Sequence, residues 1–177
     1  MKNDDTRFVS LTTPDSLAVV RRIADEIWPE TFSSILPPEQ IPYMMKMMYS
    51  PEVMERELAA GFHFDVLYIG EVPAGYVSYS KYDLPQVAKL HKVYLLSRYH
   101  GQGYGTLMLK HACARCRELG FARVRLNVNK YNARAIAAYE RNGFVRVDSV
   151  KIDIGDGFFM DDFVMEKALP GEAEDRK

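Results

Sequence analysis

The spacing of apolar residues along the chain changes from a helical period to a strand period near residue 62. Before that point, Ile41, Met44, Met45 and Met48 recur at positions i, i+3, i+4 and i+7, which predicts an amphipathic helix. Helices are expected over residues 13–28, 41–48, 51–61, 104–119 and 133–141. Strands are expected over residues 8–11, 64–69, 74–81, 87–96, 122–128, 144–154 and 158–167. The first helix is expected to end before Pro29, because proline disfavours helical geometry in the residue that precedes it.

This order of elements predicts an α/β fold of the α+β kind, in which helices flank a mixed, mostly antiparallel sheet of about seven strands. Turns at Gly70 and Gly155-Asp156-Gly157 predict two antiparallel hairpins, whereas a crossover helix enforces at least one parallel pair. A length of 177 residues suits one domain. We expect a single domain over residues 1–169 and a disordered tail over residues 170–177.

Composition and charge narrow the class of protein. Hydrophobic residues make up 47% of the chain and charged residues 27%, which suits a globular core. A net charge of -1 argues against nucleic acid or an anionic membrane as the main partner. No apolar run reaches the roughly 18 residues of a membrane helix, and no secretory signal is expected at the N-terminus. A cytoplasmic protein with neither nucleic-acid nor membrane partners is expected, and a homodimer is compatible with these features.

Cys113 and Cys116 form an isolated C-x-x-C pair within a predicted helix. A structural zinc site needs about four ligands, and the chain has no second Cys or His pair at a suitable spacing. Cys116 also falls on the apolar stripe of its helix, away from the helix start that thiol–disulfide chemistry favours. We interpret both cysteines as small buried residues in a reducing compartment and expect no metal site.

A glycine-rich connection between a predicted strand and a predicted helix carries the clearest functional signal. Gly101, Gly103 and Gly105 alternate with other residues, so the backbone can approach a ligand closely and turn its N–H groups inward. The N-terminus of the following helix favours phosphate at the same place. A Walker loop is excluded because Thr106 follows Gly105 without a lysine, and the spacing does not fit the dinucleotide fingerprint. A diphosphate-bearing ligand is the expected occupant.

The loop resembles the coenzyme A loop of the GNAT superfamily of N-acetyltransferases, which reads Gln or Arg, two residues, Gly, one residue, then Gly or Ala. The register from Arg98 to Gly103 satisfies this pattern, and the register from His100 to Gly105 departs from it only at His100. We prefer the second register, because it places the last glycine directly before the helix. A second family motif is matched by Asn132, Ala135-Ile136, Tyr139 and Gly143-Phe144. The resemblance covers about residues 62 to 168 and implies the GNAT fold.

The resemblance also implies which residues hold acetyl-CoA. Val93 and Leu95, on the strand before the loop, are expected to bind the pantetheine arm through their backbone groups. Asn132 suits the N-cap of the next helix, and the resemblance adds a hydrogen bond to the coenzyme. Tyr139 lies one turn after Ala135-Ile136 on the inward face, and the resemblance places its hydroxyl near the thioester sulfur as proton donor. The loop residues expected to contact the coenzyme are His100, Gly101, Gln102, Gly103, Tyr104 and Gly105.

The resemblance implies that an amine is acetylated and must lose a proton. Three alternatives remain open for the group that removes this proton. His91 lies on the same predicted strand face as Val93, and an imidazole titrates near neutral pH. Glu30, in the predicted turn after Trp28, is the second candidate base and can also attract a cationic substrate. Deprotonation through water, with no dedicated base, is the third alternative.

The resemblance implies transfer of the acetyl group of acetyl-CoA to a small-molecule primary amine. Residues 31–49 and 156–167 are similar, more weakly, to bacterial spermidine/spermine N-acetyltransferases, so a small polyamine is the expected acceptor. Trp28, Phe32 and the methionine-rich helix are expected to edge the acceptor pocket, and at most one of Asp161 and Asp162 can face it. The alternatives are a peptide or protein amine as acceptor, or a non-catalytic acyl-CoA-binding module.

Overall fold

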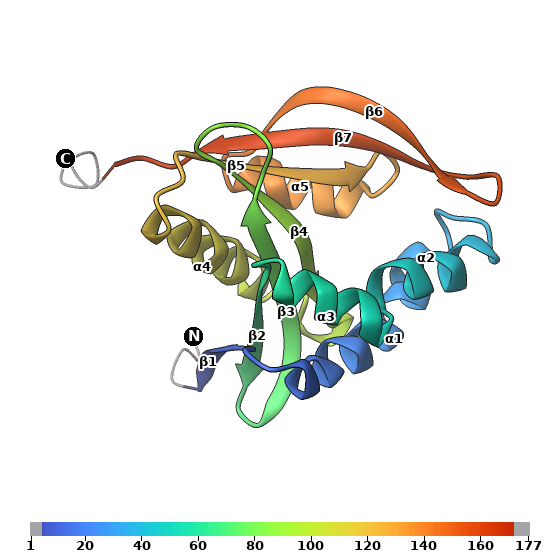
Figure 1. The fold of residues 1–177 in the computed structure, drawn as a ribbon, viewed down its shortest axis with the longest axis horizontal. Helices are drawn as coiled ribbons and strands as arrows, with labels where there is room; N and C mark the ends of the chain where they lie inside the picture. Colours follow the sequence, from blue (N-terminus) through green and yellow to red (C-terminus); the bar gives the residue numbers. More distant parts are fainter. Residues whose placement is uncertain (1–4, 172–177) are drawn as a thin grey trace. The chain divides into compact units, whose positions relative to one another are not determined.

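The computed structural model describes residues 5–171, and within them seven strands form one mixed sheet in the order β1-β2-β3-β4-β5-β7-β6 (Figure 1). The strands are β1 (Thr6–Ser10), β2 (His63–Ile69), β3 (Val72–Lys81), β4 (Val87–Leu95), β5 (Arg123–Asn129), β6 (Val145–Gly155) and β7 (Phe158–Ala168). The helices are α1 (Ala18–Phe32), α2 (Gln40–Tyr49), α3 (Pro51–Ala59), α4 (Tyr104–Glu118) and α5 (Ala133–Arg141), with 3-10 segments η1 (Pro14–Leu17) and η2 (Ser97–Tyr99). β4 and β5 are parallel and joined through α4, whereas the pairs β1–β2, β5–β7 and β6–β7 are antiparallel. The predicted fold class is therefore confirmed.

The chain forms two compact units. Of the described residues, the first unit contains 5–78 and 92–108, and the second contains 79–91 and 109–171. β3, β4 and α4 each contribute residues to both units. Among residues 5–171, no helix is both long and apolar enough to cross a membrane. The tail predicted over residues 170–177 lies outside the described residues except for Pro170 and Gly171.

Helix α1 does not end where the sequence predicted. It was expected to stop at Trp28, but it continues through Pro29 to Phe32. The Pro29 carbonyl still accepts a hydrogen bond from the Ser33 N–H at 3.2 Å, so the helix loses only the bond that a proline cannot donate. Burial of Trp28 and Phe32 offsets that loss. As a result Glu30, predicted in a turn, lies in the last turn of a helix.

The core of the first unit contains aromatic side chains whose polar atoms satisfy one another. Trp28 Nε1 donates to the Tyr49 hydroxyl at 3.1 Å, and the hydroxyls of Tyr49 and Tyr76 are 2.7 Å apart. Burial raises the pKa of both tyrosines well above the usual value. They therefore remain neutral, and their hydrogen bonds tie α1, α2 and β3 together.

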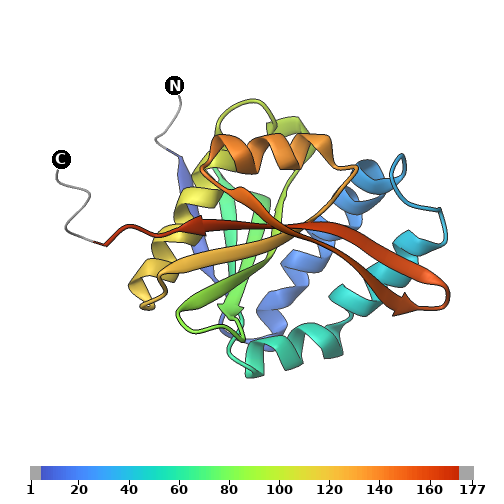
Figure 2. The same cartoon turned by 90° about the horizontal axis from the view of Figure 1, so that it is seen from above.

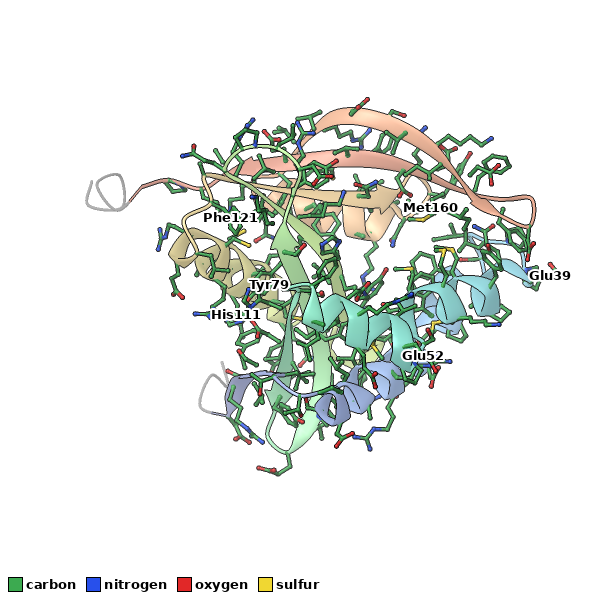
Figure 3. All side chains as sticks on the ribbon, viewed as in Figure 1. Glu39, Glu52, Tyr79, His111, Phe121 and Met160 are labelled. Carbon is green, nitrogen blue, oxygen red and sulfur yellow. The ribbon has the colours of Figure 1, made fainter. Side chains whose placement is uncertain are left out.

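A buried ion pair joins α3 to β4 in the same unit. Lys92 is buried, and its Nζ lies 2.9 Å from Glu57 Oε2. Burial lowers the pKa of Lys92, and the carboxylate of Glu57 opposes that change. Glu39 before α2 and Glu52 in the first turn of α3, in contrast, are exposed (Figure 3).

The second unit contains α5, most of α4 and the strands β5, β6 and β7. Alternate residues of β5 are buried, namely Val124, Leu126 and Val128, as expected for a strand with one face in the core. α5 runs alongside the long β6–β7 hairpin (Figure 2). Cys113 and Cys116 on α4 are buried, as predicted, and are free thiols.

Candidate active site

The connection between β4 and α4 contains the predicted glycine loop. β4 ends at Leu95, and α4 begins at Tyr104. Gly101 and Gly103 have φ angles of 73° and 87°, which residues with a Cβ rarely adopt. A Cβ added at either glycine would meet no atom within 4 Å. These glycines therefore serve the backbone conformation and leave open space beside it.

This conformation presents a run of unsatisfied backbone donors. Within residues 5–171, the N–H groups from Gly101 to Gly105 have no acceptor. Further along, the Leu107 N–H donates to the Gly103 carbonyl at 3.0 Å. Free N–H groups at a helix N-terminus attract anions, because the donors and the helix dipole act together. The donors and the open space fit the diphosphate of acetyl-CoA.

The structure shows which glycine of the loop directly precedes α4. The predicted helix start at Tyr104 is confirmed, so Gly105 lies in the first turn of α4 and not directly before the helix, where the preferred register had placed it. The glycine that precedes the helix is Gly103, which ends the register beginning at Arg98. The sequence did not distinguish these glycines, because their difference lies in φ, which is positive at Gly103 and not at Gly105. Gly101 and Gly103 belong to both registers.

Two side chains brace the loop from within. His100 Nε2 donates to the Leu95 carbonyl at 2.8 Å, and Gln102 Nε2 donates to the Arg98 carbonyl at 3.0 Å. Because a carbonyl only accepts, Nε2 of His100 carries the proton. Nδ1 of His100 is then a buried acceptor without a partner among residues 5–171. These side chains shape the loop, while its backbone donors stay available to a ligand.

The parallel ladder between β4 and β5 is short. It pairs Val87–Leu90 with Arg123–Leu126. β4 continues to Leu95 and β5 to Asn129. Val93 and Leu95 are half-buried and lie beyond this ladder, on the stretch that the resemblance assigned to the pantetheine arm. An extended ligand that carries amides can bind such a strand through backbone hydrogen bonds.

Asn132 and Tyr139 lie in the second unit, at the start and in the second turn of α5. Asn132 caps the helix as predicted, its Oδ1 accepting from the Ala135 N–H at 3.2 Å. The ring of Tyr139 packs edge to face on Phe144, with centroids 5.8 Å apart. Burial raises the pKa of Tyr139 to about 12, and its hydroxyl has no hydrogen-bond partner among the residues that the structure describes. A protonated and uncommitted hydroxyl suits a general acid.

His91 lies at the end of the second unit's part of β4. Its Nε2 is 2.8 Å from Ser80 Oγ, and Ser80 Oγ donates to the Lys81 carbonyl at 3.2 Å. The direction of the His91–Ser80 bond follows the tautomer of the imidazole, and in either direction the bond orients the ring. Ser80 was missed from the sequence, since no spacing marks a serine on a neighbouring strand as the partner of a histidine.

Glu30 is engaged by a residue of the loop. Its Oε1 and Oε2 lie 2.8 Å and 3.0 Å from Ser97 Oγ, which donates to the carboxylate. One turn earlier, Glu26 pairs with Arg98 at 2.5 Å. Ser97 and Glu26 were also missed. The i, i+4 spacing of the two glutamates was an available signal, but it was hidden because α1 was expected to end at Trp28.

Asp161 and Asp162 have different partners, as alternation along β7 predicts. Asp161 pairs with Lys130 at 2.7 Å. Burial raises the pKa of Asp162, an effect that Asn127 and Lys89 partly offset. Lys89 Nζ donates to Asn127 Oδ1, and burial lowers the pKa of Lys89 to about 8. Both carboxylates are therefore compensated by cations within the second unit.

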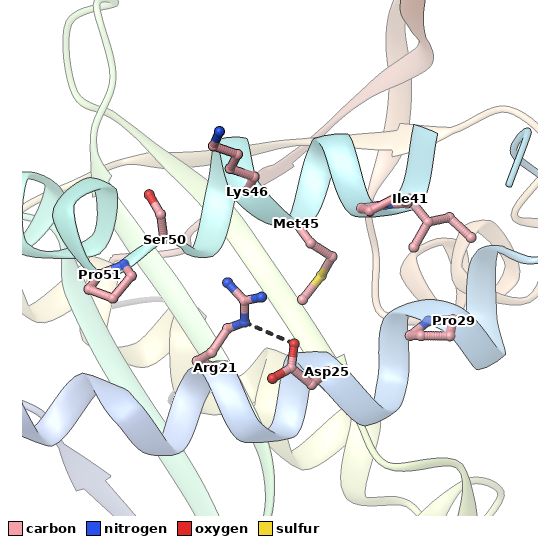
Figure 4. A pocket seen from close by; sticks show the side chains of 9 residues that line it. Arg21, Asp25, Pro29, Ile41, Met45, Lys46, Ser50 and Pro51 are labelled. Atoms are coloured by element: carbon pink, nitrogen blue, oxygen red, sulfur yellow. Dashed lines mark hydrogen bonds and ion pairs between the residues drawn. The ribbon is translucent and has the colours of Figure 1, made fainter. Parts of the chain in front are cut away.

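A hollow of about 410 Å³ opens in the first unit, between α1, α2 and the start of α3 (Figure 4). The residues that line it are Arg21, Asp25, Pro29, Ile41, Pro42, Met45, Lys46, Ser50 and Pro51. Arg21 and Asp25 form an ion pair of 2.8 Å on its α1 side. Trp28 and Phe32, expected to edge the acceptor pocket, are buried in the core, whereas Met45 of the methionine-rich helix does line this hollow.

The sequence and the fold both have known relatives. Residues 19–144 match the model of the acetyltransferase (GNAT) family. The PaiA N-acetyltransferase of Thermoplasma acidophilum, solved with coenzyme A, is 23% identical, with 92% of this chain and 99% of that chain covered and a TM-score of 0.75. The ribosomal-protein-S18-alanine N-acetyltransferase of Escherichia coli is 20% identical, with 94% and 97% covered and a TM-score of 0.69. A chimera of the Vibrio cholerae spermidine N-acetyltransferase is 14% identical, with 94% and 96% covered and a TM-score of 0.67.

These identities are low, so the solved structures bear on the fold alone. The family model, in contrast, spans well over half of the chain and includes the glycine loop and the Asn132 to Tyr139 segment. The chain therefore belongs to the acetyltransferase (GNAT) family and is an acetyl-CoA-dependent N-acetyltransferase.

Proposed function

We propose that the acceptor of the acetyl group is the primary amine of a small polyamine and that Tyr139 and His91 carry the proton transfers. The observation that supports the coenzyme site is the run of backbone donors from Gly101 to Gly105, which lacks acceptors among residues 5–171. Anionic oxygens of a diphosphate would satisfy these donors. Val93 and Leu95 would bind the amide-bearing arm on the part of β4 beyond Leu90.

In the proposed reaction the neutral amine attacks the thioester carbonyl, and the carbon–sulfur bond breaks as the thiolate leaves. Tyr139 donates its hydroxyl proton to the departing sulfur. Its pKa of about 12 keeps the hydroxyl protonated at neutral pH. Because tyrosine is a weaker acid than a thiol, the proton would move only while the carbon–sulfur bond breaks, when negative charge builds up on the sulfur. The proton that the amine loses to His91 would then pass to the tyrosinate, so that both groups return to their starting states. A backbone N–H of β4 polarises the carbonyl oxygen.

His91 is the proposed base. Ser80 orients the ring through its hydrogen bond with Nε2, and the imidazole would receive the amine proton. An imidazole has the affinity for protons that this task needs near pH 7, because its unperturbed pKa is about 6.5. Deprotonation through ordered water, without His91, is the competing route.

The half-buried ring of Tyr94, which packs against buried aromatic side chains, supports a cationic acceptor with an alkyl chain. Tyr94 is half-buried on β4 between the two pantetheine positions, and its ring lies 5.7 Å from that of Trp28 and 5.6 Å from that of Tyr76. Ring faces attract ammonium groups and methylene chains alike. Glu30, two residues after Trp28, adds a negative charge that would attract a cation. The hydrogen bond from the neutral Ser97 hydroxyl leaves this charge in place. The likeness in fold to a spermidine N-acetyltransferase agrees with this acceptor class.

A peptide or protein amine is the second acceptor class. A relative of the same fold is named for acetylating the alanine of a ribosomal protein. The two classes differ in what the site must recognise. A polyamine offers several ammonium groups on a flexible chain, whereas a peptide offers one amine beside backbone amides.

An amine panel separates these alternatives. Free coenzyme A release would be measured with acetyl-CoA and, in parallel, spermidine, spermine, single amino acids and a short peptide with a free N-terminus. The proposal expects polyamines to give the highest kcat/KM. Preferred turnover of the peptide would replace the polyamine proposal with the peptide class. Binding of acetyl-CoA without release on any amine would argue for an acceptor of another kind.

A further inference from the structure

The last two turns of α1 contact the coenzyme loop through two carboxylates. Glu26 and Glu30 are four residues apart, so they project from one face of the helix. Their partners are consecutive, because Glu26 pairs with Arg98 and Glu30 accepts from Ser97. Ser97 and Arg98 are the first two residues of η2, immediately before the glycines. All four residues belong to the first unit.

The contact at Glu30 has the geometry of a tether. Both carboxylate oxygens, at 2.8 Å and 3.0 Å, are within reach of the single proton on Ser97 Oγ. A hydrogen bond to a charged acceptor is stronger than one between neutral groups. A general base, by contrast, needs an oxygen aimed at the proton it removes, and here both oxygens face the loop.

Two further side-chain hydrogen bonds restrain the loop. His100 donates to the Leu95 carbonyl at the end of β4, and Gln102 donates to the Arg98 carbonyl within the loop itself. The segment from Ser97 to Gly103 is therefore held both to β4 and to α1. Glycines impose little conformational restraint on the backbone. These hydrogen bonds therefore keep the free N–H groups of the loop pointing in one direction.

We propose that Glu30 is a positioning residue that acts through Ser97 to hold the coenzyme loop in its diphosphate-binding conformation, and that it is not the base. This inference rests on the proposed role of the loop in binding acetyl-CoA. The tether lies on the surface, where an exposed contact adds little to overall stability. Its effect should appear in coenzyme affinity, because a preorganised loop has less ordering to do on binding.

The experiment compares Ser97→Ala, Glu30→Ala, Glu30→Gln and the double variant Ser97→Ala/Glu30→Ala. Calorimetry would measure the Kd of coenzyme A, which requires neither amine nor turnover. A positioning role predicts that Ser97→Ala and Glu30→Ala each raise Kd about 5- to 20-fold, around the lower limit for a hydrogen bond to a charged group, because the contact is exposed to solvent. The double variant should be no weaker than either single one, since one contact is removed in each. Glu30→Gln should keep much of the affinity, because its amide oxygen still accepts from Ser97.

A matched control is Asp25→Asn, on the same helix, where the carboxylate pairs with Arg21 rather than with the loop. It should leave the Kd of coenzyme A unchanged. The inference is overturned if the Ser97 and Glu30 variants bind coenzyme A like the wild type. It is equally overturned if Glu30→Gln loses kcat and its acidic pH limb while Ser97→Ala does not, since that pattern identifies a base. Failure of the wild-type protein to bind coenzyme A would instead contradict the proposed function of the loop.

Discussion

Leu90 and Leu126 form the last residue pair of the parallel ladder between β4 and β5. Both strands continue beyond this pair, β4 by five residues to Leu95 and β5 by three residues to Asn129. Backbone groups that leave a ladder must find other partners, because an unpaired buried amide is costly. In the proposed function, the part of β4 beyond this pair binds the extended arm of the coenzyme, directly before the loop whose N–H groups would bind its diphosphate.

The first prediction concerns Gly103. Binding of acetyl-CoA to the native state should raise the free energy of unfolding, by about 2.7 kcal/mol at a hundredfold excess over Kd. Gly103→Val should abolish most of this gain, because a β-branched side chain disfavours the φ of 87° and occupies the space beside the donors. A thermal shift with and without acetyl-CoA measures the gain.

Gly157→Val is the control for this variant. Gly157 has a φ of 77° in the β6–β7 turn, so the substitution imposes similar strain away from the loop. It should lower Tm without reducing the shift caused by acetyl-CoA. An undiminished shift in Gly103→Val would remove the glycine loop from the coenzyme site.

The second prediction concerns pH and His91. Turnover should rise between about pH 6 and pH 9, because a primary amine with a pKa of about 10 is mostly protonated at neutrality. His91→Ala should lower kcat and change the acidic limb of the profile. Ser80→Ala should change that limb in the same direction but by less, since it removes only the hydrogen bond that orients the ring. Superimposable profiles for the wild type and His91→Ala would leave water as the base.

The third prediction tests the packing of β3 in the absence of any ligand. A Cβ at Gly75 would lie 2.6 Å from the Tyr94 carbonyl oxygen and 3.0 Å from the Met108 side chain. Gly75→Ala should therefore lower the free energy of unfolding by about 1 to 3 kcal/mol. Ser78→Ala on the same strand should be neutral or stabilising, because its buried hydroxyl has no partner within residues 5–171. Urea unfolding measures both, and equal effects would contradict the packing described here.

The sequence predicted the elements well where a pattern is local. The helix from Ala133 to Arg141 was placed to the residue, because Asn132 caps it and Gly143 follows it. The exception is α1, where a local rule about Pro29 was overridden by burial of Trp28 and Phe32, a tertiary effect that no local pattern contains.

The site was predicted less completely, because most of it consists of long-range pairs. The glycines and the Asn132 cap are local signals and were found. Ser97 and Ser80 were not, since each acquires its role from a partner on another element, Glu30 on α1 and His91 on β4. Such pairs are distant in the sequence and become neighbours only in the folded chain. They could therefore not be predicted from local sequence patterns.

A fourth prediction follows from the raised pKa of Tyr139. The general acid must be protonated, so activity that depends on it is present below its pKa and is lost as the pH rises through it. Because burial raises that pKa to about 12, no fall in kcat from this residue should appear up to pH 10.5. A decline centred near pH 10, which is absent in Tyr139→Phe, would show that the hydroxyl titrates as an ordinary tyrosine.

The measurement that tests the account most directly is kcat for Tyr139→Phe, taken together with its affinity for acetyl-CoA. The ring remains, so its packing on Phe144 and the position of α5 should survive. The hydroxyl is lost, and a general acid contributes about 10²- to 10⁴-fold to a rate. We predict nearly normal binding of acetyl-CoA and a kcat lowered at least ~10²-fold, towards the smaller end because a thiolate leaves readily. An unchanged kcat would contradict the account, since Tyr139 would then be a packing residue and the thiolate would leave without its proton.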